Sequence, residues 1–191
     1  MPDNQISRRV QLTRHALREA MISLITERPL ASITVTDVCA RADINRTTFY
    51  LHYHCVDDLL QEVEAQIIDH IGAQFDQPPS IETLSTAIYF LKNAPDAPQV
   101  RRLLYALIGE QGDPRFVRRL HQLTYETFQR AWQARLPEVD EARKMLVFSF
   151  IVPGVISVLY TWLQGDLPDM QAEDIVAQLS ELIERGISSL S

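Results

Sequence analysis

The sequence has few cysteines and few glycines. Its 191 residues include two cysteines and six glycines. Two cysteines do not make the disulfide framework of a small secreted domain, and so few glycines exclude a collagen-like or linker-rich chain. The N-terminal segment MPDNQISRRV contains no apolar stretch of signal-peptide length. We therefore expect a cytoplasmic protein.

Motifs typical of catalysis are also absent. The sequence contains no G-x-S-x-G, no glycine-rich phosphate loop, no H-E-x-x-H and no C-x-x-C. One short segment gathers potential metal ligands, but it lacks the spaced pairs of a zinc site, and we interpret it as a polar turn. Its residues are His52, His54, Cys55, Asp57 and Asp58. Cys55 is a second candidate, as a thiol sensor, although no resolving cysteine lies near it in the sequence. We expect no metal, no cofactor and no enzymatic activity.

The negative charge is unevenly distributed. The formal net charge is −7, of which residues 1–56 contribute +2 and the remainder −9. An acidic body with a mildly basic head would offer only the head to the phosphate backbone of a nucleic acid. The overall balance, 46% hydrophobic and 23% charged residues, is that of an ordinary soluble globular protein.

Helical periodicity runs through nearly the whole chain, whereas strand signals are scarce. The first helix has one apolar stripe with the i, i+3, i+4, i+7, i+8 spacing, and it ends before Pro29. The stripe consists of Leu17, Ala20, Met21, Leu24 and Ile25. Later helices are predicted at about 57–75, 81–93, 98–110, 114–135, 138–164 and 171–189, separated by proline and glycine. The fold class is therefore all-α, with three short helices followed by a larger helical body.

Residues 145–165 form a stretch without any charged side chain, long enough to cross a bilayer. Polar residues interrupt it, Pro153-Gly154 lies at its centre, and no cluster of Lys or Arg marks an inside end. We interpret the stretch as a buried helix or a subunit interface, with a transmembrane helix as the alternative. The predicted interface of a homodimer combines residues 145–163 with a stripe on the last helix, Ile175, Leu179, Leu182 and Ile183.

The segment ITVTDVCARADINRTTFYLHY, residues 33–53, predicts two short capped helices joined by a tight turn. Thr34 and Asp37 have capping-box spacing, and Asn45 is a typical cap for a helix that we predict from Arg46 to Tyr53. This arrangement is the helix-turn-helix, whose second helix enters the major groove of DNA. Phe49 and Tyr53, the last residue of that helix, would face inward. The outward side chains would be Arg46, Thr47, Thr48, Tyr50 and His52; a merely solvated helix is the alternative.

The segment from Arg9 to Leu60 resembles the N-terminal DNA-binding domain of the TetR/AcrR family of transcriptional regulators. The resemblance lies in RRVQLTRHALREAMISLI, in residues 33–53 and in the trailing DDLL. It implies a helix-turn-helix DNA-binding domain at residues 1–56 and a helical effector-binding and dimerisation domain at residues 57–191. It further implies a homodimeric regulator, usually a repressor, that binds double-stranded operator DNA and responds to a small apolar or aromatic effector.

Carried over position by position, the resemblance places base and phosphate contacts on Thr36, Arg46, Thr47, Thr48, Tyr50, Leu51 and His52. Two positions depart from the family's pattern. Asp43 stands in the turn where many members have glycine, and aspartate tolerates the left-handed conformation better than most residues. Val56 stands where a lysine commonly grips a phosphate, so the grip there would fall to the backbone amides of the helix start.

The helical body is rich in aromatic residues. Candidates for the wall of an effector cavity are Tyr89, Tyr105, Phe116, Tyr125, Phe128 and Phe148. Ordinary core packing is the alternative for each of them. Two other classes of function compete with the regulator. One is a helical protein-interaction or ligand-carrier module with a degenerate helix-turn-helix, which is favoured by Val56 in place of the usual lysine. The other is an all-α enzyme, but the sequence contains no arrangement of catalytic residues.

Overall fold

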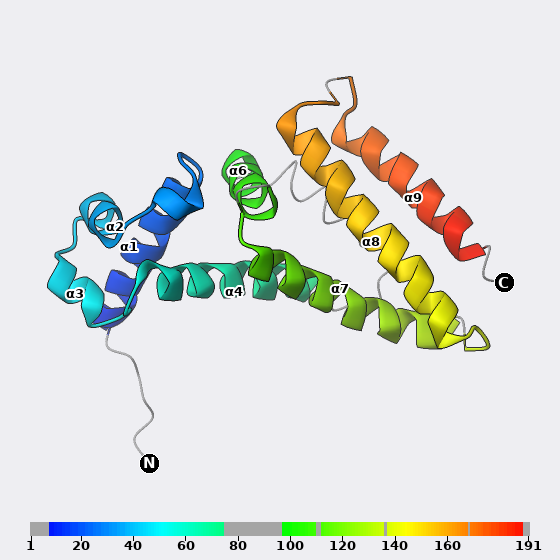
Figure 1. Ribbon diagram of the computed structural model, residues 1–191, viewed down its shortest axis with the longest axis horizontal. Coiled ribbons are helices and arrows are strands. Elements are labelled where there is room, and N and C mark those ends of the chain that lie inside the picture. The colour runs from blue at the N-terminus through cyan, green and yellow to red at the C-terminus, as the bar shows by residue number, and fades with distance from the viewer. Residues whose placement is uncertain (1–7, 75–96, 110–111, 136, 168, 189–191) are drawn as a thin grey trace, which may run out of the picture. The chain divides into compact units, whose positions relative to one another are not determined.

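The computed structural model describes residues 8–74, 97–109, 112–135, 137–167 and 169–188, and these form helices and turns without a strand (Figure 1). The helices are α1 (Arg8–Ile25), the short 3-10 helix η1 (Leu30–Ser32), α2 (Val35–Ala42), α3 (Arg46–Tyr50), α4 (Val56–Gln74), α6 (Ala97–Ile108), α7 (Pro114–Arg135), α8 (Glu141–Gln164) and α9 (Ala172–Ser188). The predicted all-α fold is confirmed. The helix expected at 81–93 lies outside the described residues.

The chain divides into two compact units, Met1–Ile67 and Ile68–Ser191. The division falls inside α4, whose first residues belong to the first unit. The functional boundary that we expect between residues 56 and 57 stays a prediction.

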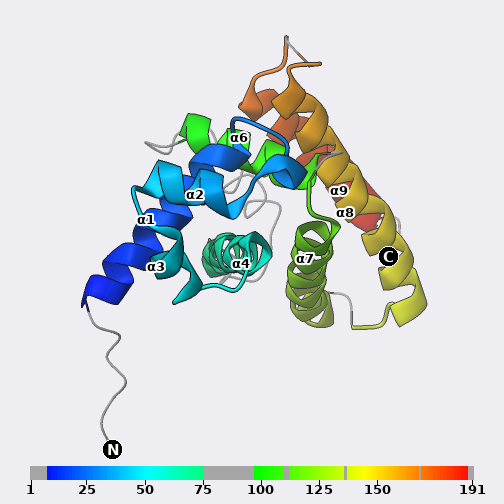
Figure 2. The same ribbon diagram turned by 60° about the vertical axis from the view of Figure 1, so that its left-hand side comes forward.

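In the first unit α1 packs against α2, and α2 against α3 (Figure 2). The apolar stripe predicted for the first helix is buried along its whole length, from Leu17 to Ile25. Phe49 of α3 and Leu59 of α4 are buried with it, each 0% exposed. The three-helix head therefore has an apolar core of its own, against which α3 is anchored.

In the second unit α8 and α9 lie side by side in both views (Figures 1 and 2). Ile175 and Leu179 of α9 are buried against α8 side chains that include Val155 and Trp162. Ile183 is buried as well, whereas Leu182 is 65% exposed. The prediction that the whole α9 stripe joins the dimer interface is therefore wrong, because Ile175 and Leu179 are covered by α8 of the same chain. Periodicity shows that a face is apolar but not which neighbour covers it.

By length and composition α8 is the one candidate membrane span within the described residues, with a mean hydropathy of 2.0 over its most apolar window, of which 11% is buried. Leu146 is 71% exposed and Phe150 is 83% exposed. The helix contacts α6, α7 and α9 on its other sides. It therefore carries an apolar face, marked by Leu146 and Phe150, that the described part of the chain leaves exposed.

Candidate nucleic-acid interface

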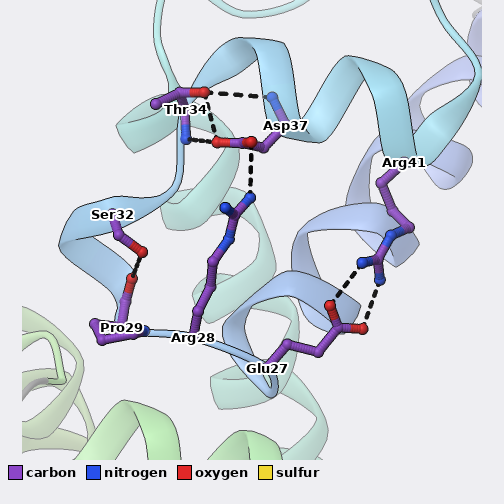
Figure 3. A network of polar contacts seen from close by, with 7 residues as sticks. All are labelled: Glu27, Arg28, Pro29, Ser32, Thr34, Asp37 and Arg41. Carbon is purple, nitrogen blue, oxygen red and sulfur yellow. Dashed lines mark hydrogen bonds and ion pairs between the residues drawn. The ribbon is translucent and has the colours of Figure 1, made fainter.

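The start of α2 is held by a capping box, as the sequence predicts (Figure 3). The Thr34 backbone N–H donates to Asp37 Oδ2 at 2.8 Å, and the Asp37 N–H donates to Thr34 Oγ1 at 3.3 Å. The Arg28 guanidinium forms an ion pair with Asp37, with Nη2 and Oδ1 3.0 Å apart. These contacts set the direction in which the chain enters α2.

The free energy of unfolding is expected to depend on pH through Asp37. Hydrogen bonds from Thr34 and Arg28 lower the pKa of Asp37 from 3.8 to about 2. Because the folded-state pKa is the lower one, the ionised carboxylate stabilises the fold above the unfolded-state value of 3.8. This contribution is lost as the pH falls from there through about 2.

Urea unfolding of the wild type and of Asp37→Asn, repeated across this acidic range and at neutral pH, measures the effect. The difference in the free energy of unfolding between the two proteins should be largest at neutral pH and should disappear as the pH falls through about 2. A difference that stays constant with pH would show that the charge of Asp37 does not stabilise α2.

A second ion pair holds the other end of α2. Arg41 Nη1 and Nη2 lie 2.7 and 2.6 Å from the two carboxylate oxygens of Glu27, in the segment that follows α1 (Figure 3). The Arg41 hydrogen bond is the main cause that lowers the pKa of Glu27. Exposed ion pairs contribute little to stability. The two hydrogen bonds between Arg41 and Glu27 join the end of α2 to the segment that follows α1.

The turn between α2 and α3 keeps its geometry without glycine. Asp43 caps α2 in the left-handed conformation, with φ 55° and ψ 44°. It is the one non-glycine residue with positive φ in the described part of the chain. Asn45 then caps α3, since its Oδ1 accepts from the Thr48 backbone N–H at 2.7 Å. Both expectations for the turn are confirmed.

Helix α3 ends at Tyr50, and the predicted end at Tyr53 is wrong. The amides of His52 and Tyr53 both donate to the Phe49 carbonyl, at 2.9 and 3.0 Å, which tightens the chain into a turn. Tyr53 is nevertheless buried, at 4% exposed. The apolar spacing of Phe49 and Tyr53 is satisfied by a helix and by this turn alike, so periodicity did not reveal where the helix ends.

The side chains predicted to contact DNA lie on the first turn of α2, on α3 and on the turn that follows it. Phe49 and Tyr53 face the core, as expected. The others divide by exposure: Thr36, Arg46, Thr47, Tyr50 and Leu51 are exposed, and Thr48 and His52 are half-buried. Tyr50 is 48% and Leu51 77% exposed. A guanidinium, hydroxyls and an aromatic ring of this kind suit contacts to phosphates and to base edges.

A carboxylate on α4 fastens the end of the α3 turn, and sequence reasoning missed it. Glu62 accepts hydrogen bonds from Arg14, from Arg18 Nη1 at 2.7 Å and from Tyr53 Oη at 3.0 Å. The Arg14 guanidinium also lies 5.7 Å from the centroid of the Tyr53 ring. Burial raises the pKa of Glu62, but the three hydrogen bonds outweigh it and the pKa is lowered. The spacing of Arg14 and Arg18 places them on the same face of α1. No short-range pattern in the sequence predicts that their partner is Glu62, more than forty residues later.

The segment before α4 is a polar turn. The His54 backbone N–H donates to Asp58 Oδ2 at 2.8 Å, and Asp57 and Asp58 lie in the first turn of α4. Val56, the first residue of α4, is half-buried. Within the described ranges, no three histidine, cysteine or acidic side chains come together as metal ligands.

The structure brings together three of the candidate effector residues. Tyr125 and Phe128 of α7 contact Phe148 of α8, with ring centroids 5.0 and 5.8 Å apart, and the three line one hollow. Phe116 is fully buried, and Tyr105 stacks on Tyr160 with centroids 5.3 Å apart. Neither lines the hollow. Tyr89 lies outside the described residues.

Comparison with known proteins finds similarity to transcriptional regulators. The model of a TetR-type transcriptional regulator C-terminal region matches residues 99–185. The HTH-type transcriptional regulator YxbF of Bacillus subtilis (strain 168) is 40% identical over 74 residues. The chain is therefore similar to TetR-type transcriptional regulators in its C-terminal region and to an HTH-type regulator over a shorter stretch. The match to YxbF spans 36% of this chain and only 20% of the length of YxbF.

Solved structures of TetR-family regulators share the fold. A TetR regulator from Streptococcus agalactiae 2603V has a TM-score of 0.71 at 24% identity, covering 92% of this chain and 96% of its own. NalD, the secondary repressor of the MexAB-OprM multidrug efflux pump in Pseudomonas aeruginosa, has a TM-score of 0.68 at 16% identity, covering 94% and 98%.

Proposed function

We propose that this protein is a TetR-type regulator, a cytoplasmic repressor that binds double-stranded operator DNA as a homodimer and responds to a small apolar or aromatic effector. The observation that carries the DNA-binding part is the construction of α3. Asn45 caps it, Phe49 buries its inner face, and Arg46 and Tyr50 point to solvent. A short, firmly anchored helix with exposed donors is what insertion into the major groove requires.

The capped start of α3 suits base recognition. Recognition helices contact base edges with their N-terminal residues, and Arg46 and Thr47 are the first residues of α3. The Arg46 guanidinium would donate to the O6 and N7 acceptors of a guanine, the commonest specific contact in the major groove. Thr36 and Thr48 would position the helix through phosphate contacts, which carry no sequence information.

The homodimer accounts for the uncovered apolar face of α8. Exposed side chains such as Leu146 and Phe150 would pack against the same face of a second copy, which is how a two-fold interface is built. Such a dimer would present two α3 helices to half-sites about 34–36 Å apart or at a multiple of that spacing. A repressor role is supported by the fold shared with NalD, which is named a repressor.

A mobility-shift assay with DNA upstream of the protein's own gene tests the proposed function. Wild type should give a sequence-dependent, salt-sensitive shift, and Arg46→Ala should weaken it by about 1–3 kcal/mol, the value of one good base contact. Tyr50→Phe should weaken it as well, and neither variant should melt at a lower temperature, since both positions are exposed. Arg102→Ala, an exposed arginine of α6, is the control. Unchanged affinity in both α3 variants would refute the assigned face, and the absence of any shift would favour an interaction or carrier module.

Val56→Lys is expected to steepen the salt dependence of DNA binding. A lysine at the start of α4 would neutralise one more phosphate per subunit, so the log–log slope should steepen by up to about 2 per dimer. The gain in affinity should be the same for operator and unrelated DNA, because a phosphate contact does not read bases. Titrations of both proteins across a salt series measure the slope. Coincident slopes would show that position 56 does not face the DNA backbone.

A further inference from the structure

Leu51 is the most exposed large apolar side chain described in the first unit, at 77%. It directly follows α3, whose outer face we propose to meet DNA. The side chains two positions before and after it, Phe49 and Tyr53, are 0% and 4% exposed. Leu51 therefore points away from the core that anchors α3.

The backbone sets this direction. Leu51 keeps right-handed helical angles, with φ −73° and ψ −18°, and its N–H donates to the Thr48 carbonyl at 3.2 Å. Two helical residues correspond to a rotation of about 200°, so Leu51 lies almost opposite the buried Phe49. Thr47, one turn earlier, is exposed on the same side of the helix. Thr47 and Leu51 thus form the ridge of α3 opposite its buried face.

Leu51 differs in chemistry from the side chains around it. Arg46 and His52 carry polar groups that can contact phosphates or the polar groups of bases. A leucine side chain has no donor or acceptor, so a polar group of DNA buried against it would lose a hydrogen bond to water without gaining another. Contact with Leu51 is therefore favourable only for an apolar group on the DNA.

The major groove offers one such group on the edges of its bases. Thymine carries a methyl group at C5, and apolar side chains recognise it by direct contact. Cytosine has no methyl group and presents an N4 amino donor, which leucine cannot accept. An apolar side chain on the outermost ridge of a recognition helix thus favours thymine over the other pyrimidine.

We propose that Leu51 selects a thymine in each half-site of the operator by packing against its C5 methyl group. This inference rests on the proposed binding of DNA by α3 and adds the base that Leu51 reads. Arg46 would recognise a guanine by hydrogen bonds, and Leu51 would recognise a thymine on another base pair by apolar contact.

Replacing thymine with deoxyuridine removes the methyl group and keeps every hydrogen-bonding group of the base. The probe is a duplex from the DNA upstream of the protein's own gene, made with each thymine replaced in turn and titrated with the intact chain. At one position in each half-site, the replacement should weaken wild-type binding about fourfold, the effect expected from burying one methyl group. Replacement in both half-sites should weaken binding about fifteenfold, because the two contacts are separate and add.

Protein variants assign the effect to Leu51. Leu51→Ser should bind the thymine and deoxyuridine duplexes equally, and it should melt like the wild type because the position is exposed. Arg46→Ala, at an exposed position of the same helix, is the matched control. It should weaken binding to both duplexes by the same factor and keep the preference for thymine.

The outcomes separate this proposal from the proposed function. A wild type that shifts the DNA but is insensitive to deoxyuridine at every position would overturn the role of Leu51 and leave DNA binding by α3 intact. An unchanged thymine preference in Leu51→Ser would overturn it as well, since the methyl group would then act through another side chain or through the stiffness of the DNA. The absence of any shift would overturn both proposals.

Discussion

Replacing Phe49 with alanine is expected to lower the free energy of unfolding by about 3–5 kcal/mol, the usual cost of removing a buried phenylalanine ring. Phe49 is 0% exposed and anchors α3 in the core of the first unit. Its ring meets Tyr50 edge to face at 5.5 Å and Tyr53 at 5.7 Å between centroids. A loss of this size is a large part of the roughly 5–15 kcal/mol that stabilises a typical domain.

Urea unfolding followed by circular dichroism measures the loss. Leu51→Ala is the matched control, because Leu51 follows the same helix and is 77% exposed. It should change stability by no more than about 0.5 kcal/mol. Equal stability of Phe49→Ala and wild type would show that the inner and outer faces of α3 have been exchanged, and with them the proposed DNA contacts.

Phe150→Asp is expected to dissociate the proposed homodimer. Phe150 is 83% exposed on α8, beside Leu146 at 71%. Central aromatic anchors of an interface are worth about 2 kcal/mol or more each. A two-fold interface contains the substitution twice, so the loss is on the order of 4 kcal/mol, about a thousandfold in the dissociation constant.

Sedimentation velocity at micromolar concentration measures the oligomeric state. Wild type should sediment as a dimer and Phe150→Asp as a monomer with an unchanged helical spectrum. Leu12→Asp, at a 60% exposed position of α1, should leave the dimer intact. A monomeric wild type would refute the dimer, and a wild type that needs detergent to stay in solution would point to the membrane alternative for α8.

The local features of the DNA-binding head were predictable because they depend on neighbouring residues. The capping box of Thr34 and Asp37, the Asn45 cap and the left-handed Asp43 all involve groups within one helical turn. The buried stripe of α1 follows from the same kind of regularity. Side-chain types at fixed short spacings therefore sufficed to predict the helix-turn-helix.

Other features required the tertiary structure because distant residues create them. The Glu62 contacts with Arg14 and Arg18 join positions 48 and 44 residues apart. The sequence predicted an uncharged stretch in α8 and an apolar stripe on α9, but only packing decided that α9 covers one side of α8 and leaves Phe150 exposed. In the same way, the contacts of Tyr125 and Phe128 with Phe148 result from the packing of α7 against α8. Spacing along a helix determines which side chains share a face, whereas the tertiary fold determines which element packs against that face.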